Sequence, residues 1–249
     1  MRLIIFFLII FSLTFSLMPQ QKVYVVKRAE GKIIIDGKLT EKDWKKAEVI
    51  DTFYVLPKGE AGELRKAVSK SRARLLWDDK FLYVGVEMED LDLWADRKEH
   101  DSDLWNNDVI ELFVKPREDS FHYYEFEINP LNTTLDLFFP RRGAGTWNRW
   151  VGYESGIRSA VTLKGTLNNW KDRDEGWVVE FAIPFTAFSQ TTPPPHPGDK
   201  WRFAICRYDY SVYLPESYPQ GKELSTSFPF TEASFHRYED YGVMVFVKP

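Results

Sequence analysis

A segment in the middle of the chain carries three polar side chains that could hydrogen-bond a ligand. Residues 123–129 alternate as a β-strand does, with Glu125, Glu127 and Asn129 on one face and apolar side chains on the other. In the apolar segment before it, Glu111 interrupts an otherwise hydrophobic face. A carboxylate is costly to bury alone, so these groups either line a wetted groove or lie on the solvated outer face of a sheet.

The nine tryptophans fall into two groups according to their neighbours. Four lie in or beside alternating apolar segments and are predicted to be buried: Trp44, Trp77, Trp177 and Trp201. Five lie among polar and charged residues: Trp94, Trp105, Trp147, Trp150 and Trp170. An open indole suits the axial C–H groups of a pyranose, because the ring face is negative. The loop tryptophans therefore either stack on a sugar or cover the ends of the domain.

The scaffold that positions these residues is predicted to be made of strands. Short apolar segments alternate with period two and end at turn residues, at 81–89, 109–114, 123–129, 135–139, 177–183, 201–208 and 241–247. One short helix is expected, with Trp44 and Ala47 on its buried side. This pattern predicts an all-β fold, a two-sheet antiparallel β-sandwich of the jelly-roll kind with one short helix and long loops.

Several of these segments, in this order, resemble carbohydrate-binding module family 9. The resemblance runs from about residue 33 to the C-terminus and is carried by residues 35–37 with Trp44, 73–84, 104–113, 123–129, 177–184 and 234–242. It implies a β-sandwich module, usually attached to xylanases, that holds the end of a glycan chain between two aromatic rings. It also implies a structural calcium ion, which members tend to hold.

The resemblance assigns roles to particular positions. Trp105 stands where the family has its first stacking tryptophan, and Phe235 stands where the second is expected, so the second ring is smaller. Glu111 and Asn129 match polar ligands of the sugar. The carbohydrate-binding residues predicted on this basis are Trp105, Glu111, Glu127, Asn129 and Phe235.

Two positions depart from the family pattern. Glu127 replaces an arginine that binds hydroxyl groups, which reverses the local charge. Cys206 stands where a glutamine is expected and cannot both donate and accept as an amide does. Glu127 therefore favours ligands rich in hydrogen-bond donors and disfavours uronic acids, because like charges repel at short range.

Metal binding is considered for a loop rich in aspartates. Oxygen ligands suit calcium, and the alternative is a solvated acidic loop; the residues are Asp90, Asp92, Asp96, Asp101, Asp103 and Asp108. The four histidines are scattered, which gives a zinc site little support. Arg207 follows Phe203 and Ile205 on an apolar face and is either a structural ion-pair partner or a ligand.

Two other functions stay open. A glycoside hydrolase would use Glu111 with Glu127 as its paired carboxylates. A haem-binding sandwich would need axial ligands, for which Met88 and Met244 are the methionine candidates on probable core faces. Neither a nucleophile elbow nor a phosphate-binding glycine loop occurs in the sequence, so catalysis is not predicted.

Composition and the N-terminus set the cellular context. Residues 1–18 combine Arg2 with a mostly apolar stretch and are predicted to be a signal peptide or an uncleaved anchor, with residues 19–249 forming a single domain. A net charge of −4 argues against nucleic acid, and one cysteine excludes a disulfide framework. The expected protein is secreted, cell-surface or periplasmic, touches a membrane only through an uncleaved N-terminus, and binds an oligosaccharide or polysaccharide without catalysis.

Overall fold

A computed structural model describes residues 23–56, 62–144 and 152–249, and these residues are mostly strands. The first strands are β1 (Val23–Arg28), β2 (Val49–Ile50), β3 (Tyr54–Leu56), β4 (Ser71–Trp77), β5 (Phe81–Glu89), β6 (Val109–Lys115) and β7 (Tyr123–Ile128). The others are β8 (Thr134–Phe139), β9 (Arg158–Lys164), β10 (Gly176–Pro184), β11 (Lys200–Tyr210), β12 (Lys222–Thr226) and β13 (Gly242–Val247). The all-β prediction is confirmed.

The helical segments are short. They are α1 (Lys42–Lys46) and the 3-10 turns η1 (Leu104–Asn106), η2 (Phe185–Phe188), η3 (Pro219–Gly221) and η4 (Tyr238–Asp240). The expected helix is confirmed as α1, with Trp44 and Ala47 buried beside it.

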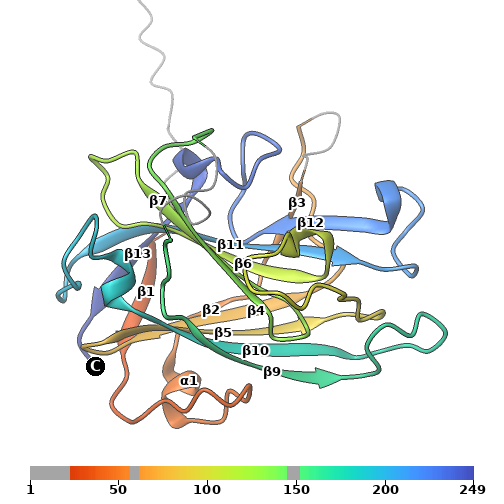
Figure 1. The fold of residues 1–249 in the computed structure, drawn as a ribbon, viewed down its shortest axis with the longest axis horizontal. Coiled ribbons are helices and arrows are strands. Elements are labelled where there is room, and N and C mark those ends of the chain that lie inside the picture. Colours follow the sequence, from red (N-terminus) through yellow and green to blue (C-terminus); the bar gives the residue numbers. More distant parts are fainter. Residues whose placement is uncertain (1–22, 57–61, 145–151) are drawn as a thin grey trace, which may run out of the picture.

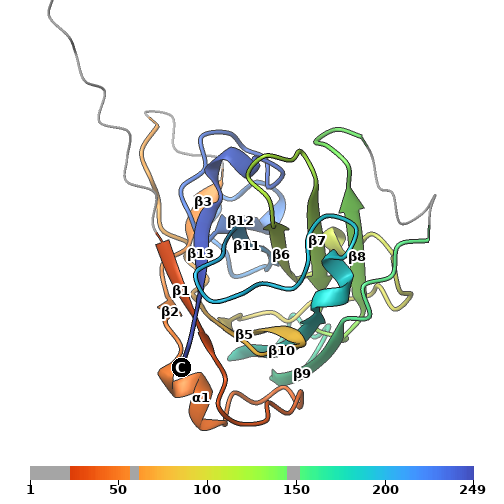
Figure 2. The same cartoon turned by 90° about the vertical axis from the view of Figure 1, so that its left-hand side faces the viewer.

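The strands form two layers that face each other across the core (Figures 1 and 2). The hydrogen-bonded order is β8-β7-β6-β11-β13-β1-β4-β5-β10-β9, with β12 and β3 extending from β11 and β2 pairing with β4. Strand β1 joins the two layers because it pairs in parallel with both β13 and β4, whereas the other pairs are antiparallel. The predicted sandwich is thus one continuous sheet folded over its core.

Alternation along the strands fills the space between the layers. The predicted inner face of β5 is buried, at Leu82, Val84, Val86 and Met88. All four tryptophans predicted to lie in the core are also buried. In β7, Tyr124 and Phe126 pack against Phe188 between the layers. Because side chains alternate across a strand, Glu125 and Glu127 lie on the opposite face of this layer.

The structure contains strands that the sequence pattern did not show. Strand β9 lies at the edge of the sheet and pairs only with β10, and its side chains are half-buried or exposed along their whole length. Strand β1 has four apolar residues in succession before its basic end, so period two is not visible in its sequence. Edge pairing and continuous apolar runs both weaken the alternation that identifies a strand.

A buried carboxylate attaches the segment before α1 to the sheet. Glu180 of β10 accepts a hydrogen bond from the indole nitrogen of Trp44 at 2.9 Å and from the backbone amides of Asp36 and Gly37. Gly37 has a φ of +77°, and a Cβ there would lie 3.0 Å from the Val161 carbonyl carbon, so only glycine fits without strain. These contacts give a structural reason for the 35–37 motif.

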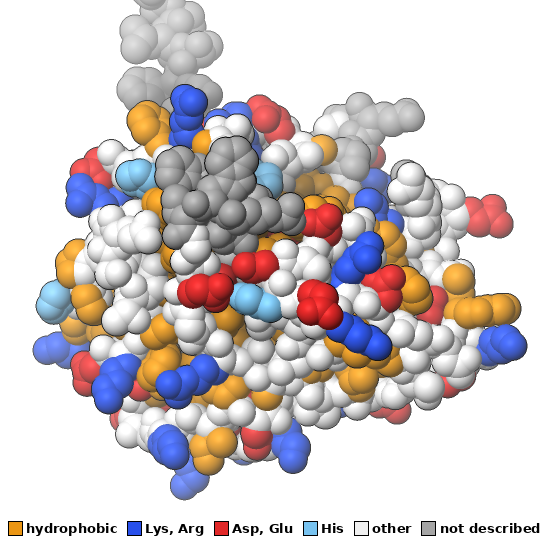
Figure 3. Space-filling model, in the orientation of Figure 1, with side chains coloured by type: hydrophobic (Ala, Val, Ile, Leu, Met, Phe, Trp, Pro, Cys, Tyr) orange, Lys and Arg blue, Asp and Glu red, His pale blue; other side chains and the backbone are white. Residues whose placement is uncertain are grey.

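Some sequence predictions fall outside the described residues. The predicted signal or anchor segment 1–18 lies there, as do Trp147 and Trp150. Among the residues that are described, no helix has the length and apolar character needed to cross a membrane. On the face shown in Figure 3, acidic and basic side chains are interspersed with apolar ones, which favours local pairing over a field of one sign.

Candidate functional site

A cavity of about 670 Å³ opens on the face of strands β6, β7 and β8 opposite to the one on which Tyr124 and Phe126 pack against Phe188. Strands β3, β6, β7, β8, β11 and β12 supply its floor, and the η1 turn and the loops at 142–143 and 233–236 supply its rim. Its lining consists of Leu56, Trp105, Glu111, Phe113, Tyr123, Glu125, Glu127, Leu137, Phe139, Arg142, Gly143, Tyr208, Leu224, Ala233, Ser234, Phe235 and His236.

Three glutamates, which we call the glutamate triad, form the polar part of this floor. Glu111 of β6 lies directly opposite Glu127 of β7, and Glu125 is the next residue on the same face of β7. Carboxylate oxygens of the three lie within 4.8 Å of one another, and the residues are at most 5% exposed. Burial, and to a smaller extent repulsion from Glu125, raises the pKa of Glu111 well above its usual range. Burial and the charges of Glu111 and Glu125 do the same to the pKa of Glu127.

Aromatic side chains surround the triad. Trp105 lies on the η1 turn, is half-buried against the core, and has its backbone carbonyl held by the Tyr210 hydroxyl at 2.8 Å. Phe235 is 6% exposed and packs edge-to-face on Tyr208, with ring centroids 5.2 Å apart. Tyr123 stacks on Phe139 at 4.6 Å. A polar floor inside an aromatic wall can hydrogen-bond one part of a ligand while stacking on another.

The structure brings together four of the five predicted binding residues. Trp105, Glu111, Glu127 and Phe235 all line the cavity. Asn129 lies outside the lining, beyond the end of β7, and is fully buried. Its amide nitrogen donates to the Arg97 carbonyl and to Asn107, and its oxygen accepts from two backbone amides of the following turn. The side chain of Asn129 therefore holds a turn together.

Sequence reasoning missed several lining residues. Tyr208 follows Cys206 by two positions in β11, so the alternation of that strand contained the signal. The sequence pattern also allows Glu125 to lie on a solvated sheet face, yet in the structure it is 5% exposed and belongs to the triad. His236 and Arg142 come from loops, where no periodicity indicates direction.

Cys206 lies next to the triad without lining the cavity. It pairs with Glu111 across β11 and β6 and is fully buried. Burial raises the pKa of its thiol, and the nearby charges of Glu111 and Glu125 add to the effect. The neutral thiol supplies no charge to balance the glutamates.

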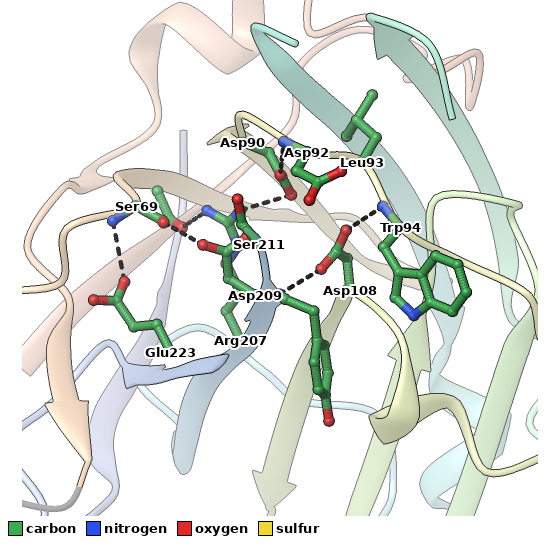
Figure 4. Close-up of polar contacts among 12 residues, drawn as sticks. Ser69, Asp90, Asp92, Leu93, Trp94, Asp108, Arg207, Asp209, Ser211 and Glu223 are labelled. Carbon is green, nitrogen blue, oxygen red and sulfur yellow. Dashed lines mark hydrogen bonds and ion pairs between the residues drawn. The ribbon is translucent and has the colours of Figure 1, made fainter. Parts of the chain in front are cut away.

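A second buried cluster, which we call the aspartate–arginine cluster, joins Asp90, Asp108 and Asp209 to Arg207 (Figure 4). Arg207 is fully buried and donates to Asp90 at 3.0 Å and Asp209 at 3.2 Å, which confirms a structural ion pair. The other oxygens of the three aspartates accept from the backbone amides of Asp92, Trp94 and Tyr210 and from the Ser69 hydroxyl.

These contacts test the calcium expectation. Each of the six carboxylate oxygens in the aspartate–arginine cluster already has a donor, and a guanidinium occupies the position of a cation. Calcium requires six to eight free oxygen ligands, so these residues do not fit a calcium ion. Of the other predicted aspartates, Asp101 lies beside His100 and Glu154 on a partly exposed surface.

The geometry also bears on the two alternative functions. Glu111 and Glu127 lie directly opposite each other on neighbouring strands, with carboxylate oxygens within 4.8 Å. A retaining hydrolase separates its two carboxyls by about 5–5.5 Å and an inverting one by about 6.5–9.5 Å, in both cases across the scissile bond, whereas these two lie on the same floor. Met88 and Met244 are both buried in the main hydrophobic core. Haem binding would require that core to open around them.

Exposed aromatic residues line a second hollow near the η1 turn. It has a volume of about 540 Å³ and includes Trp94 and Trp170, which are 38% and 61% exposed. The Trp94 indole donates to the Asn106 carbonyl, so this hollow lies close to Trp105. The loop tryptophans thus differ in environment. Among those that the structure describes, Trp105 is the one that lines the cavity of the glutamate triad.

Comparison with known proteins identifies the family. Residues 35–247 match the model of the carbohydrate family 9 binding domain-like family. The chain belongs to this family. The match confirms the resemblance seen in the sequence and covers the glutamate triad, the η1 turn and the closing strand.

Related sequences occur within larger enzymes. This family 9-like chain is 28% identical over 160 residues to the exoglucanase XynX of Acetivibrio thermocellus, covering 64% of the chain and 12% of that enzyme. It is 31% identical over 159 residues to the endo-1,4-beta-xylanase C of Paenibacillus barcinonensis, covering 62% and 12%. The chain therefore spans about an eighth of the length of these relatives.

Solved structures share the fold. A family 9 carbohydrate-binding module of Caldicellulosiruptor kristjanssonii in complex with cellotriose superposes with a TM-score of 0.62 at 16% identity, covering 92% of this chain and 95% of that one. The structure of a family 9 module from the same organism in complex with glucose gives a TM-score of 0.59 at 17% identity, with coverages of 92% and 97%.

Proposed function

We propose that this chain is a non-catalytic saccharide-binding module whose binding site is the cavity between Trp105, Phe235 and the glutamate triad. The observation that carries the proposal is the joining of aromatic rings and carboxylates in one cavity of suitable size. Pockets for small ligands have volumes of about 300–1,000 Å³ and combine apolar walls with a few polar groups. Family membership agrees with this role.

The aromatic wall and the polar floor have separate tasks in this proposal. The rings cover the C–H faces of a sugar, and the carboxylates accept hydrogen bonds from its hydroxyl groups. Related solved modules are complexes with cellotriose and glucose, so β-linked glucosides are the first ligands to test.

The cellular setting follows from the N-terminus and the relatives. Residues 1–18 have the composition of an export signal or anchor, which leads us to place the module outside the cytoplasm. The relatives that contain similar segments are named as xylanases and an exoglucanase. A partner enzyme acting on plant-type polysaccharide is part of the proposal.

Isothermal titration calorimetry with cellotriose and xylo-oligosaccharides tests the proposed site. Trp105→Ala is expected to weaken binding by about 1–3 kcal/mol, because it removes an aromatic anchor of the cavity. Trp170→Ala is the matched control, since Trp170 is exposed and lies outside the cavity lining. Equal affinities of the two variants, with both folded by circular dichroism, would remove Trp105 from the site.

A further inference from the structure

We infer that the cavity selects a saccharide carrying a protonated amine, with the ammonium group held by Glu111, Glu125 and Glu127. This inference rests on the proposed function and adds the chemical class of the ligand.

The first support is a set of buried acceptors without donors. Glu127 is 0% exposed, and within the described chain neither of its carboxylate oxygens accepts a hydrogen bond from an N–H or O–H donor. When Glu127 is protonated its carboxyl donates to Glu125, and once both are ionised Oε2 of Glu125 has no donor either. Leaving buried carboxylate oxygens unpaired costs several kcal/mol or more, so native proteins rarely keep them without a partner. Because Glu127 lines the cavity, the missing donor can come from a ligand.

The second support is that, among the described residues, no lysine or arginine charge acts on the triad carboxyls. Arg142 lines the cavity, but its guanidinium makes two contacts with Glu239, at 2.7 and 2.8 Å. His236 is bonded through Nδ1 to the Tyr123 hydroxyl, and its charge acts on Glu125 alone in the triad. The other titratable groups near the triad are acids, which carry no positive charge whether or not they are protonated: Tyr123, Tyr208, Cys206 and Asp103.

An ammonium group matches this arrangement. It carries one positive charge and three N–H donors, and the triad offers three carboxylates whose oxygens lie within 4.8 Å of one another. Burial raises the pKa of each triad carboxyl, so the free protein holds protons there up to a higher pH than an exposed glutamate does. A bound ammonium brings one positive charge and so replaces one of these protons, which leaves to the solvent.

The cavity walls favour an organic cation over a metal ion. The volume of about 670 Å³ is that of a small-molecule site, and Phe113, Leu137 and Phe235 supply no oxygen ligands. A calcium ion would need six to eight oxygens, all from three side chains and water. The aromatic rings instead suit the faces of a sugar and the charge of an amine.

Calorimetry with three trimers of the same linkage tests this inference. The ligands are a β-1,4-linked trimer of glucosamine, its fully N-acetylated form and cellotriose, each measured at about pH 7 where the triad and the amine can exchange protons. We expect the glucosamine trimer to bind at least tenfold more tightly than the other two and to release protons, measured as a dependence of the heat on the buffer's ionisation enthalpy.

Glu127→Gln separates charge from shape. The variant keeps the size of the side chain but carries no charge, so the ratio of the glucosamine-trimer affinity to the cellotriose affinity is expected to fall by about tenfold. Glu175→Gln, which changes an exposed residue just before β10 in the other layer, is the matched control and should keep the preference.

The outcomes distinguish the two proposals. If cellotriose binds and the glucosamine trimer binds no more tightly, the amine inference fails while the saccharide function stands. If no trimer binds to the folded wild-type protein, both fail. If calcium or magnesium chloride alone raises the unfolding temperature and competes with the amine, the triad is a metal site and the inference is overturned.

Discussion

Two clusters of three carboxylates are buried in the part of the chain that the structure describes, and their surroundings differ. In the aspartate–arginine cluster every carboxylate oxygen has a donor, and Arg207 supplies a positive charge. In the glutamate triad both oxygens of Glu127 and one of Glu125 have none. The first cluster lies among interior strand ends and loops, whereas the second lines a cavity.

The difference shows that burial of acids does not by itself identify a site. Burial raises the pKa of Asp108 and of Glu127 alike, so the shift alone does not separate structure from function. Donor satisfaction separates them, because a satisfied cluster stabilises the fold and an unsatisfied one is stabilised by what it binds. Three measurements test whether the two clusters differ in this way.

The largest effect is expected for removal of the buried cation. Arg207→Met should lower the free energy of unfolding by about 3–5 kcal/mol, because Asp90 and Asp209 lose their shared donor in the interior. Urea unfolding at neutral pH measures this. Arg117→Met, which removes an exposed arginine paired with Asp119, is the control and should leave the midpoint unchanged.

A change of less than about 1 kcal/mol in Arg207→Met would contradict a stabilising role for the aspartate–arginine cluster. The presence of donors would then not distinguish a cluster that stabilises the fold from one that does not.

For the glutamate triad we expect a substitution to raise the free energy of unfolding rather than lower it. Glu127→Gln should raise the free energy of unfolding of the ligand-free protein by about 1–2 kcal/mol at slightly alkaline pH, because it removes one of three like charges. The folded protein holds protons on these carboxyls more tightly than the unfolded chain does. Stability is therefore fully present below the ordinary glutamate value of 4.5 and falls as pH rises through the raised folded pKa.

Urea unfolding over a series of pH values measures this slope, which is about 1.4 kcal/mol per pH unit for each proton involved. Asp90 and Asp108 also have raised pKa values, so the difference between wild type and Glu127→Gln isolates the triad. Glu175→Gln should follow the wild-type curve. A variant that is less stable than wild type at alkaline pH would mean that Glu127 has a donor.

The smallest effect is expected for metal removal. Because every carboxylate oxygen of the aspartate–arginine cluster already has a donor, we expect no calcium ion there, so a chelator should leave the unfolding temperature of the purified protein unchanged and added calcium should not raise it. Differential scanning calorimetry with chelator and with calcium chloride makes the comparison. A calcium-dependent rise would place an ion on oxygens outside this cluster, in agreement with the calcium expectation.

The sequence predicted the strand faces well, and its limits can be traced to particular residues. Leu82, Val84 and Val86 are buried as expected, because period two fixes the side of a strand on which a residue lies. The same period-two rule also placed Asn129 on the face of Glu125 and Glu127, although Asn129 lies one residue beyond the end of the strand. Strand β7 ends at Ile128, and the chain turns there, so alternation no longer determined the direction of the next side chain.

What the sequence by itself determined is the fold class, the family and the residues that face each side of a strand, because these depend on local periodicity and on ordered motifs. Only the tertiary structure decided which distant residues meet. The register of β6 against β7 sets Glu111 opposite Glu127, and the path of two loops brings Phe235 and Trp105 to the same cavity. Pairing register and loop path are set by packing of the whole sheet, which no short stretch of sequence contains.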